Sequence, residues 1–326
     1  MVNTQKIFNI KTKAEFNALA LQTFKHQFKT NMVYKEFCKH LGKNPINVNS
    51  IEKIPFIPID FFKSKIILSD KEKAETIFTS SGTTGSVTSK HYVSNINLYK
   101  ESYIKAFRYF YGHEEDYCVL ALLPSYLERQ GSSLIYMVND LIDKSSHPES
   151  GFFLKDTNTL ITTLKKLEAA KTKTLLIGVS FALLDLIEET HLNLKNTIVM
   201  ETGGMKGRRK EMIREELHDT LKNGLGVSKI HSEYGMTELL SQAYSKGDGI
   251  FHCPPWMKVL TRDTEDPLSI QEYGKTGGVN VIDLANVNSC SFIATQDLGK
   301  IYEDDSFEIL GRFDHSDIRG CNLLVL

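Results

Sequence analysis

A run of small polar residues and glycines, Thr-Ser-Ser-Gly-Thr-Thr-Gly at 79–85, has the composition of a phosphate-binding loop. Glycines let a backbone turn tightly and approach a ligand, and hydroxyls with exposed amides can surround phosphate oxygens. No Gly-Lys-Ser/Thr follows at the Walker spacing, and a lone glycine-rich segment is more often an ordinary turn. The candidate phosphate contacts are Ser80, Ser81, Gly82, Thr83, Thr84 and Gly85.

A second segment, Tyr-Gly-Met-Thr-Glu at 234–238, follows an expected strand at 229–232. Tyr234, beside Gly235, could stack on a base, and Thr237 could donate a hydrogen bond to a phosphate. The Glu238 carboxylate could hold Mg²⁺. The alternative is a strand-to-helix turn in which Thr237 and Glu238 only begin a helix.

Two later segments carry an aspartate and an arginine, in Thr-Gln-Asp-Leu-Gly at 295–299 and Gly-Arg-Phe-Asp at 311–314. A buried Asp297 could accept hydrogen bonds from two ribose hydroxyls, and Arg312 could reinforce that contact. The alternative is a pair of ordinary turns that an Asp–Arg contact closes.

The elements that must position these segments alternate in type along the chain. Apolar runs predict buried strands, helical spacing predicts the segments between them, and together they indicate an α/β fold. We expect a largely parallel sheet with flanking helices, and a strand-rich portion beyond about residue 249. The expected strands are 76–79, 118–123, 175–179, 198–200 and 307–310, and the expected helices follow residue 97 and span 206–223.

The N-terminal segment predicts a long amphipathic helix. Thr12 and Glu15 form a capping-box pattern, and apolar residues continue at near-helical spacing to Met32. No linker or repeat interrupts the chain, which favours one catalytic body over residues 1–310 and a short tail at 311–326.

Bulk properties exclude several classes of function. The 326 residues carry a formal net charge of −1, which gives no field favouring nucleic acid, and no apolar run is long enough to span a membrane. The five cysteines are widely spaced without a CxxC pair, so neither a disulfide framework nor a structural zinc site is expected. The simplest interpretation is a reduced cytoplasmic protein.

The order and spacing of the polar segments resembles the adenylate-forming superfamily of acyl-CoA synthetases, luciferases and nonribosomal adenylation domains. The resemblance implies the fold of that superfamily's N-terminal domain and the use of ATP and Mg²⁺. It implies that Glu238 binds the metal, that Gly203 and Gly204 line the adenine pocket, and that Asp297 and Arg312 hold the ribose.

A narrower resemblance, to LuxE-type acyl-protein synthetases, is carried by two further segments, Leu-Pro-Ser-Tyr-Leu-Glu-Arg at 123–129 and Asp-His-Ser-Asp-Ile-Arg-Gly-Cys-Asn-Leu at 314–323. The resemblance to this family extends over nearly the whole chain. The resemblance implies an acid–thiol ligase that activates a fatty acid to acyl-AMP and passes the acyl group to a cysteine thiol. It also implies an acyl-reductase protein as a possible partner. The candidate catalytic residues are then Cys321, Glu238 and Thr237.

The sequence departs from the wider superfamily in two ways. Only residues 313–326 follow Arg312, so we expect no large mobile C-terminal lid domain and leave open what replaces it. Four residues also separate Gly85 from Lys90, which displaces the lysine of the loop.

Other interpretations stay open at this level. Cys321 alone could be a small buried apolar residue, and Cys118 lies in an apolar run typical of a structural position. His231 could face the acyl carboxylate or could be a packed core histidine. The alternative functions are a phenylacetate-type CoA ligase, acyl transfer to a sugar or carrier protein, and a non-catalytic nucleotide-binding scaffold. The chain length of the acid, the final acceptor and the oligomeric state are not determined.

Overall fold

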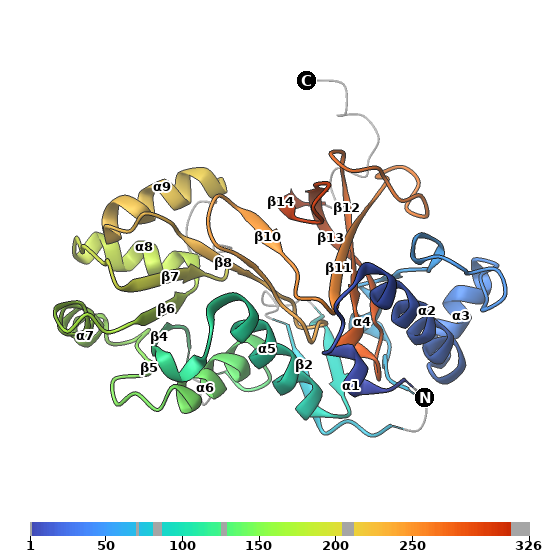
Figure 1. The fold of residues 1–326 in the computed structure, drawn as a ribbon, viewed down its shortest axis with the longest axis horizontal. Helices are drawn as coiled ribbons and strands as arrows, with labels where there is room; N and C mark the ends of the chain where they lie inside the picture. The colour runs from blue at the N-terminus through green and yellow to red at the C-terminus, as the bar shows by residue number, and fades with distance from the viewer. Residues whose placement is uncertain (1, 70–71, 81–86, 125–128, 204–211, 314–326) are drawn as a thin grey trace.

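The polypeptide is built around a long mixed sheet, seen in a computed structural model that describes residues 2–69, 72–80, 87–124, 129–203 and 212–313. Over those residues the sheet has twelve strands in the order β11-β12-β13-β14-β10-β9-β8-β7-β6-β4-β5, with β1 beside β13. Its two ends lie in different parts of the molecule, one flanked by helices α5–α9 and the other by α1–α4 (Figure 1).

One half of the sheet is parallel, and its strands β4 and β6 are buried along their whole length. Its strands are β4 (Cys118–Leu122), β5 (Gly151–Phe152), β6 (Thr174–Gly178), β7 (Thr197–Glu201) and β8 (His231–Tyr234). The helices around it are α5 (Ile96–Tyr111), α6 (Ser133–Ser145), α7 (Thr157–Ala169), α8 (Ser180–Glu189) and α9 (Arg214–Leu225). Alternate residues of β4 enter two different apolar clusters, as the pleat of a strand requires. The α/β prediction is confirmed.

The other half of the sheet is antiparallel and comes from the strand-rich C-terminal portion, as predicted. Its strands are β9 (Ala243–Ser245), β10 (Ile250–His252), β11 (Met257–Arg262), β12 (Thr276–Asp283), β13 (Phe292–Ile301) and β14 (Phe307–Arg312). Short connections between these strands permit antiparallel pairing, whereas parallel pairs need long crossovers. β1 (Ile57–Pro58) adds a parallel pair to β13. The sheet as a whole is therefore mixed.

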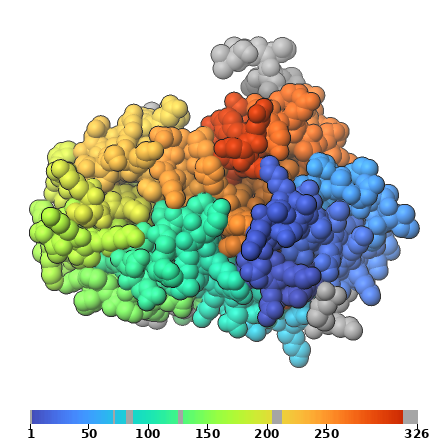
Figure 2. Space-filling view, viewed as in Figure 1, coloured from blue at the N-terminus to red at the C-terminus, as the bar shows by residue number. Residues whose placement is uncertain are grey.

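The N-terminal helices pack against this antiparallel half, shown in blue beside orange in Figure 2. They are α1 (Thr4–Ile7), α2 (Lys13–Thr30), α3 (Met32–His40) and α4 (Phe61–Ser64). The Thr12–Glu15 capping box of α2 is present as predicted. The helix predicted to reach Met32 ends at Thr30, because Asn31 is extended and its side chain accepts from the Tyr34 amide to cap α3.

A separate hairpin, β2 (Thr76–Thr79) with β3 (Lys90–Val93), flanks the glycine-rich segment. The prediction of a strand at 76–79 is confirmed, and Thr79 pairs with Lys90. Three single 3₁₀ turns complete the described elements: η1 (Ile51–Lys53), η2 (Glu114–Asp116) and η3 (Leu284–Asn286). Within the described ranges, no helix combines the length and the apolar composition that crossing a bilayer requires.

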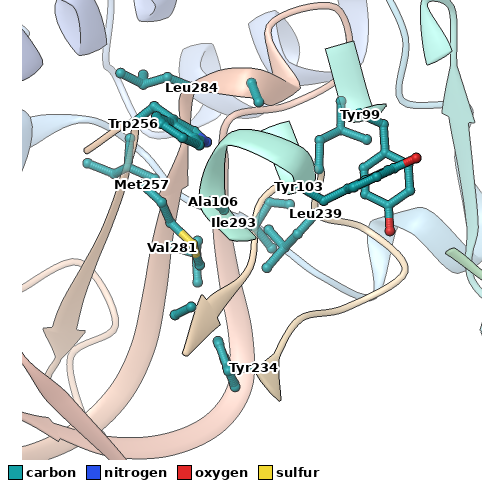
Figure 3. Close-up of a cluster of buried hydrophobic side chains, with 14 of the residues drawn as sticks. Tyr99, Tyr103, Ala106, Tyr234, Leu239, Trp256, Met257, Val281, Leu284 and Ile293 are labelled. Carbon is teal, nitrogen blue, oxygen red and sulfur yellow. The ribbon is translucent and has the colours of Figure 1, made fainter. Parts of the chain in front are cut away.

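A buried cluster joins α5 to the antiparallel half. Tyr99, Tyr103 and Ala106 of α5 lie close to Leu239, with Trp256 and Val281 in the same cluster (Figure 3). The Trp256 Nε1–H donates to Ser102 Oγ at 3.0 Å, and Ser102 lies 3.0 Å from Ser241 Oγ. This buried polar contact fixes α5 against the loop that follows residue 238.

Gln27 on α2 makes the polar link between the N-terminal helices and the sheet. Its Nε2 donates to the carbonyls of Asn286 and Val287 at 3.1 and 2.9 Å, and its Oε1 accepts from the Ser291 amide at 3.1 Å. The Gln27 side chain is fully buried. These bonds satisfy main-chain groups of the turn between β12 and β13, which would otherwise be buried without partners.

We expect Gln27→Leu to lower the free energy of unfolding by about 2–4 kcal/mol, because several buried main-chain groups lose their partners together. Urea unfolding followed by circular dichroism measures this change. Lys25→Met, on the exposed side of the same helix, is the matched control and should change stability by less than about 0.5 kcal/mol. Equal stabilities for the two variants would contradict the importance of the Gln27 bonds.

Candidate active site

The Asp297 carboxylate of β13 lies at the centre of the candidate site, where it is reached by Tyr234 at the end of β8 and by Arg312 of β14. The Tyr234 hydroxyl donates to Asp297 Oδ2 at 2.8 Å, and Arg312 Nε donates to Asp297 Oδ1 at 2.8 Å. Asp297 and Arg312 are also direct partners in the β13–β14 ladder. Residues that are 63 and 15 positions apart from Asp297 in the sequence are thus brought to one carboxylate.

The surroundings of the Tyr234 hydroxyl keep it protonated, so that it can donate a hydrogen bond. Burial, followed by the charge of Asp297, raises the pKa of the Tyr234 phenol well above its ordinary value, so it keeps its hydrogen. Its ring packs edge-on against Phe251 and Phe307, with centroids 5.9 and 5.6 Å apart. An ionised carboxylate has about four acceptor positions, so Asp297 retains capacity for the two hydroxyls of a ribose.

Arg262 is a neighbour that the sequence analysis missed. Its Nη2 donates to the Thr295 carbonyl at 2.6 Å, and its Nη1 donates to the carbonyl of Val279 at 2.8 Å. Thr295 Oγ1 accepts from the Asp297 amide at 3.1 Å. Arg262 therefore stabilises the strand that carries Asp297. No local motif marks it, because its partners, two main-chain carbonyls and the Asn280 side-chain oxygen, lie on other strands.

The Thr237–Glu238 segment is not the start of a helix, so that alternative is wrong. It is a turn that leads into β9. The Asp283 carboxylate accepts the amides of Leu240 and Ser241 at 2.7 and 3.0 Å and the Ser241 hydroxyl at 2.6 Å. The turn is therefore fixed from the β12 side of the sheet.

Glu238 lies in this turn with only 5% of its surface exposed. Burial raises the pKa of its carboxyl, against the opposing effects of the Ser89 hydroxyl and the positive charges of Arg312 and Lys63. A nearby cation would offset the cost of burying the ionised form. No cluster of three or more potential metal ligands occurs among the described residues. A single carboxylate can still contribute to a Mg²⁺ site, because this ion is commonly bound by one or two carboxylates together with substrate phosphates.

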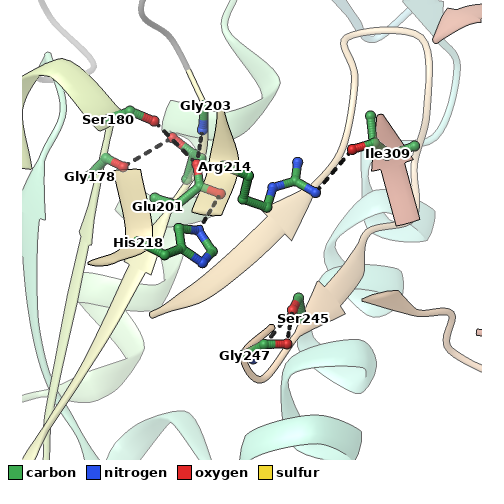
Figure 4. A network of polar contacts seen from close by, with 10 residues as sticks. Gly178, Ser180, Glu201, Gly203, Arg214, His218, Ser245, Gly247 and Ile309 are labelled. Atoms are coloured by element: carbon green, nitrogen blue, oxygen red, sulfur yellow. Dashed lines mark hydrogen bonds and ion pairs between the residues drawn. The ribbon is translucent and has the colours of Figure 1, made fainter. Parts of the chain in front are cut away.

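A polar network around Glu201 shapes the turn at Gly203 (Figure 4). Glu201 Oε2 accepts from the Gly203 amide at 2.6 Å and from the Ser180 hydroxyl at 3.2 Å, and His218 Nε2 lies 3.6 Å from Oε1. Gly203 has φ +71°, and an added Cβ would meet open space. That Gly203 and Gly204 line an adenine pocket stays a prediction, and Gly204 lies outside the described residues.

The glycine-rich segment is described only at its start. Ser80 Oγ accepts from the Ser89 amide at 2.9 Å, which closes the base of the β2–β3 hairpin. The predicted phosphate contacts Ser81, Gly82, Thr83, Thr84 and Gly85 lie outside the described residues, as does Cys321. Gly235 follows β8, where an added Cβ would lie 2.3 Å from Glu233 Oε1.

His231 is the first residue of β8, the strand that ends at Tyr234, and it is partly buried. The Tyr111 hydroxyl is 3.2 Å from its Nδ1. Burial, followed by the positive charges of Lys246 and Lys229, lowers the pKa of His231 to about 4. The neutral ring packs against Tyr111 with centroids 5.7 Å apart, which is the arrangement of a core histidine.

The four cysteines in the described part of the chain are free thiols in surroundings that disfavour the thiolate. Burial raises the pKa of Cys38 to about 12 and that of Cys118 to about 11. Burial also raises the pKa of Cys253 and Cys290. The prediction that Cys118 is structural agrees with its complete burial in β4.

Comparison with known proteins identifies the family. The model of the family "Acyl-protein synthetase, LuxE" matches residues 8–326. A long-chain-fatty-acid–luciferin-component ligase of Vibrio harveyi is 23% identical over 327 residues, covering 92% of this chain and 84% of that protein. A protein of the same name from Photorhabdus luminescens is 35% identical over 68 residues, or 21% of this chain and 58% of the relative.

Solved structures share the fold. An open conformation of 2-hydroxyisobutyryl-CoA ligase with 2-HIB-AMP and CoA superposes with a TM-score of 0.64, at 12% identity, over 94% of this chain and 72% of that one. ATP-bound MatB from Rhodopseudomonas palustris gives a TM-score of 0.53 at 21% identity over 72% of this chain. The match spans about half of MatB, 47% of its length. The predicted adenylate-forming fold is confirmed, and the chain belongs to the LuxE acyl-protein synthetase family.

Proposed function

We propose that this protein activates a long-chain fatty acid with ATP to form an acyl-adenylate and transfers the acyl group to a protein cysteine thiol. The observation that carries the proposal is the convergence of Tyr234 and Arg312 on the Asp297 carboxylate, close to the Thr237–Glu238 turn. Family membership supports the class of reaction. The name of the Vibrio harveyi relative supports a long-chain fatty acid as substrate.

In this proposal, different residues contact the ribose, the base and the phosphates of the nucleotide. Asp297, held by Tyr234 and Arg312, accepts the ribose hydroxyls with its free lone pairs. The open turn at Gly203 receives the base. Thr237 and the hydroxyls of the glycine-rich segment would donate to the phosphates, and Glu238 would hold Mg²⁺, which would supply positive charge to neutralise the phosphates.

The first half-reaction is a displacement at phosphorus. A carboxylate oxygen of the fatty acid forms a bond to the α-phosphorus of ATP, the bond from that phosphorus to the bridging oxygen breaks, and pyrophosphate leaves. Negative charge grows on the phosphate oxygens in the transition state, so fixed donors such as the Thr237 hydroxyl lower the barrier. Arg312, within electrostatic reach of Glu238, adds positive charge on the same side.

The second half-reaction transfers the acyl group to sulfur. The thiol loses its proton to solvent, and the thiolate attacks the carbonyl carbon of the mixed anhydride. The single bond between that carbon and the oxygen it shares with the phosphate breaks, and AMP leaves. We assign the thiol to Cys321, between Gly320 and Asn322. Burial raises the pKa of each of the four cysteines in the described ranges, which makes them poor nucleophiles at neutral pH.

Two further features of the proposal concern the cell. A thioester on a protein is an activated acyl group, so an acyl-reductase protein is a suitable acceptor partner. We also assign the protein to the cytoplasm. The free thiols of the four described cysteines support this location, because disulfides are rare in that reducing compartment.

Glu238→Gln should lower fatty-acid-dependent ATP–pyrophosphate exchange by about 10²–10³-fold, because the main carboxylate for Mg²⁺ is lost. The fold should persist, since glutamine has the same shape and burial disfavours the charge that it removes. Glu272→Gln, an exposed partner of Lys275, is the control and should keep normal exchange. Normal exchange in folded Glu238→Gln would show that Glu238 does not bind the metal.

Asp297→Asn should raise KM for ATP by about 10–100-fold, which corresponds to the loss of charge-assisted hydrogen bonds. The turnover at saturating ATP should change far less, because ribose contacts are similar in the ground and transition states. Steady-state exchange kinetics measure both constants, with exposed Asp248→Asn as control. An unchanged KM would indicate that Asp297 only closes the β13–β14 ladder.

Cys321→Ser should separate the two half-reactions. Pyrophosphate exchange should persist, while labelled acyl group bound to the protein should fall to background, because serine is a poor nucleophile without an activating base. Hydroxylamine should release the label from the wild-type protein, as it does from thioesters. Cys253→Ser is the matched control and should label normally. Full hydroxylamine-sensitive labelling of Cys321→Ser would assign the acceptor elsewhere, and acylation of soluble CoA instead of protein would favour a CoA ligase.

A further inference from the structure

His91 lies in β3, the strand that follows the glycine-rich segment, and its side chain is fully buried. Its Nδ1 is 2.8 Å from the Thr237 carbonyl oxygen, and its Nε2 is 3.0 Å from Asn286 Oδ1. Asn286 Nδ2 donates to the Glu238 carbonyl at 2.8 Å. Two buried side chains therefore contact the consecutive carbonyl groups of Thr237 and Glu238.

Both partners of the His91 ring, the Thr237 carbonyl oxygen and Asn286 Oδ1, are acceptors. A neutral imidazole has one N–H, so it can donate to only one of them at a time. Burial lowers the pKa of His91 to about 4, against the effects of its contacts with Thr237 and Asn286. The neutral ring places its one N–H on Nδ1, at the shorter of the two distances, and donates to the Thr237 carbonyl, while Nε2 then makes no hydrogen bond to Asn286 Oδ1.

The contacts of His91 and Asn286 take the place that helical hydrogen bonds would have if the turn began a helix. His91 is 146 residues from Thr237, and Asn286 is 48 residues from Glu238. The Phe62 ring packs edge-on against the His91 ring at 5.7 Å, and Gln27 holds the Asn286 carbonyl. His91 and Asn286 are therefore themselves fixed in orientation by the core.

We infer that His91 is a positioning residue that sets the orientation of the Thr237–Glu238 turn toward the phosphates and Mg²⁺. The inference rests on the proposed function and adds to it a residue from the β2–β3 hairpin. Holding the Thr237 carbonyl fixes the direction of the Thr237 hydroxyl and of the adjoining Glu238 carboxylate. Displacements of about 1 Å at such groups can cost on the order of 100-fold in rate.

Three substitutions at one position test this role. His91→Phe keeps the ring and removes both nitrogens, His91→Asn places an N–H near the position of Nδ1, and His91→Gln places one near the position of Nε2. We expect His91→Phe to lower the turnover of pyrophosphate exchange by about 30–100-fold, with KM for ATP within about twofold of wild type. His91→Asn should recover most of the loss, and His91→Gln should recover less.

A binding measurement is independent of turnover. Mn²⁺ titrated into protein with a non-hydrolysable ATP analogue, followed by electron paramagnetic resonance, should bind at least fivefold more weakly to His91→Phe. Amide hydrogen exchange over residues 237–241 should be faster in that variant, and exchange over the β13–β14 ladder should be unchanged. His91→Asn should resemble the wild-type protein in both measurements.

Tyr34→Phe is the matched control, because it also removes one buried hydrogen bond, that of the Tyr34 hydroxyl to the Pro55 carbonyl at 2.7 Å. It should lower thermal stability without weakening Mn²⁺ binding. Mn²⁺ affinity in His91→Phe equal to that of this control would overturn the inference. If His91→Phe does not fold, equal Mn²⁺ affinity in His91→Asn and His91→Gln would overturn it instead. Absence of fatty-acid-dependent exchange in the wild-type protein would refute the proposed function, while the Mn²⁺ arm would still decide the role of His91.

Discussion

Two residue pairs join β10 to β14, Ile250 with Glu308 and Phe251 with Phe307, and through them the strands on the β8 side of the sheet are joined to β11–β14. The rings of Phe251 and Phe307 are stacked with centroids 5.4 Å apart. Tyr234 packs against both rings and reaches Asp297 across the junction. The candidate ribose contact therefore depends on this aromatic junction, which fixes the separation of β8 from β13.

Charge at the junction is balanced across several elements. Arg312 bonds to Asp297 and also lowers the electrostatic cost of the buried Glu238. Arg214 of α9 lies over the Phe251 ring and donates to the Ile309 carbonyl at 3.2 Å, which ties the helix layer to β14 (Figure 4). Because buried charges are costly without partners, these contacts keep the site ordered while leaving acceptor positions for a ligand.

The parts of the site that sequence could predict are those marked by local composition. A run of apolar residues predicts β4, β6 and β7, and the segment at 234–238 stands out by its own residues. The sequence predicts a contact between Asp297 and Arg312, and the structure explains it, because the two residues are partners in the pairing of β13 with β14. Arg262, His91 and Asn286 carry no such signal, because each bonds to groups that lie far away along the chain.

The sequence by itself determined the α/β class, the order of the candidate nucleotide-binding segments and the LuxE family, since hydrophobic periodicity and motif residues are local properties. Only the tertiary structure decided that the sheet is mixed, that the helix predicted through Met32 breaks at Asn31, and that the Thr237–Glu238 segment is a turn. The physical reason is hydrogen bonding. The carbonyls of that turn are satisfied by His91 and Asn286, and such non-local partners exist only once the chain has folded.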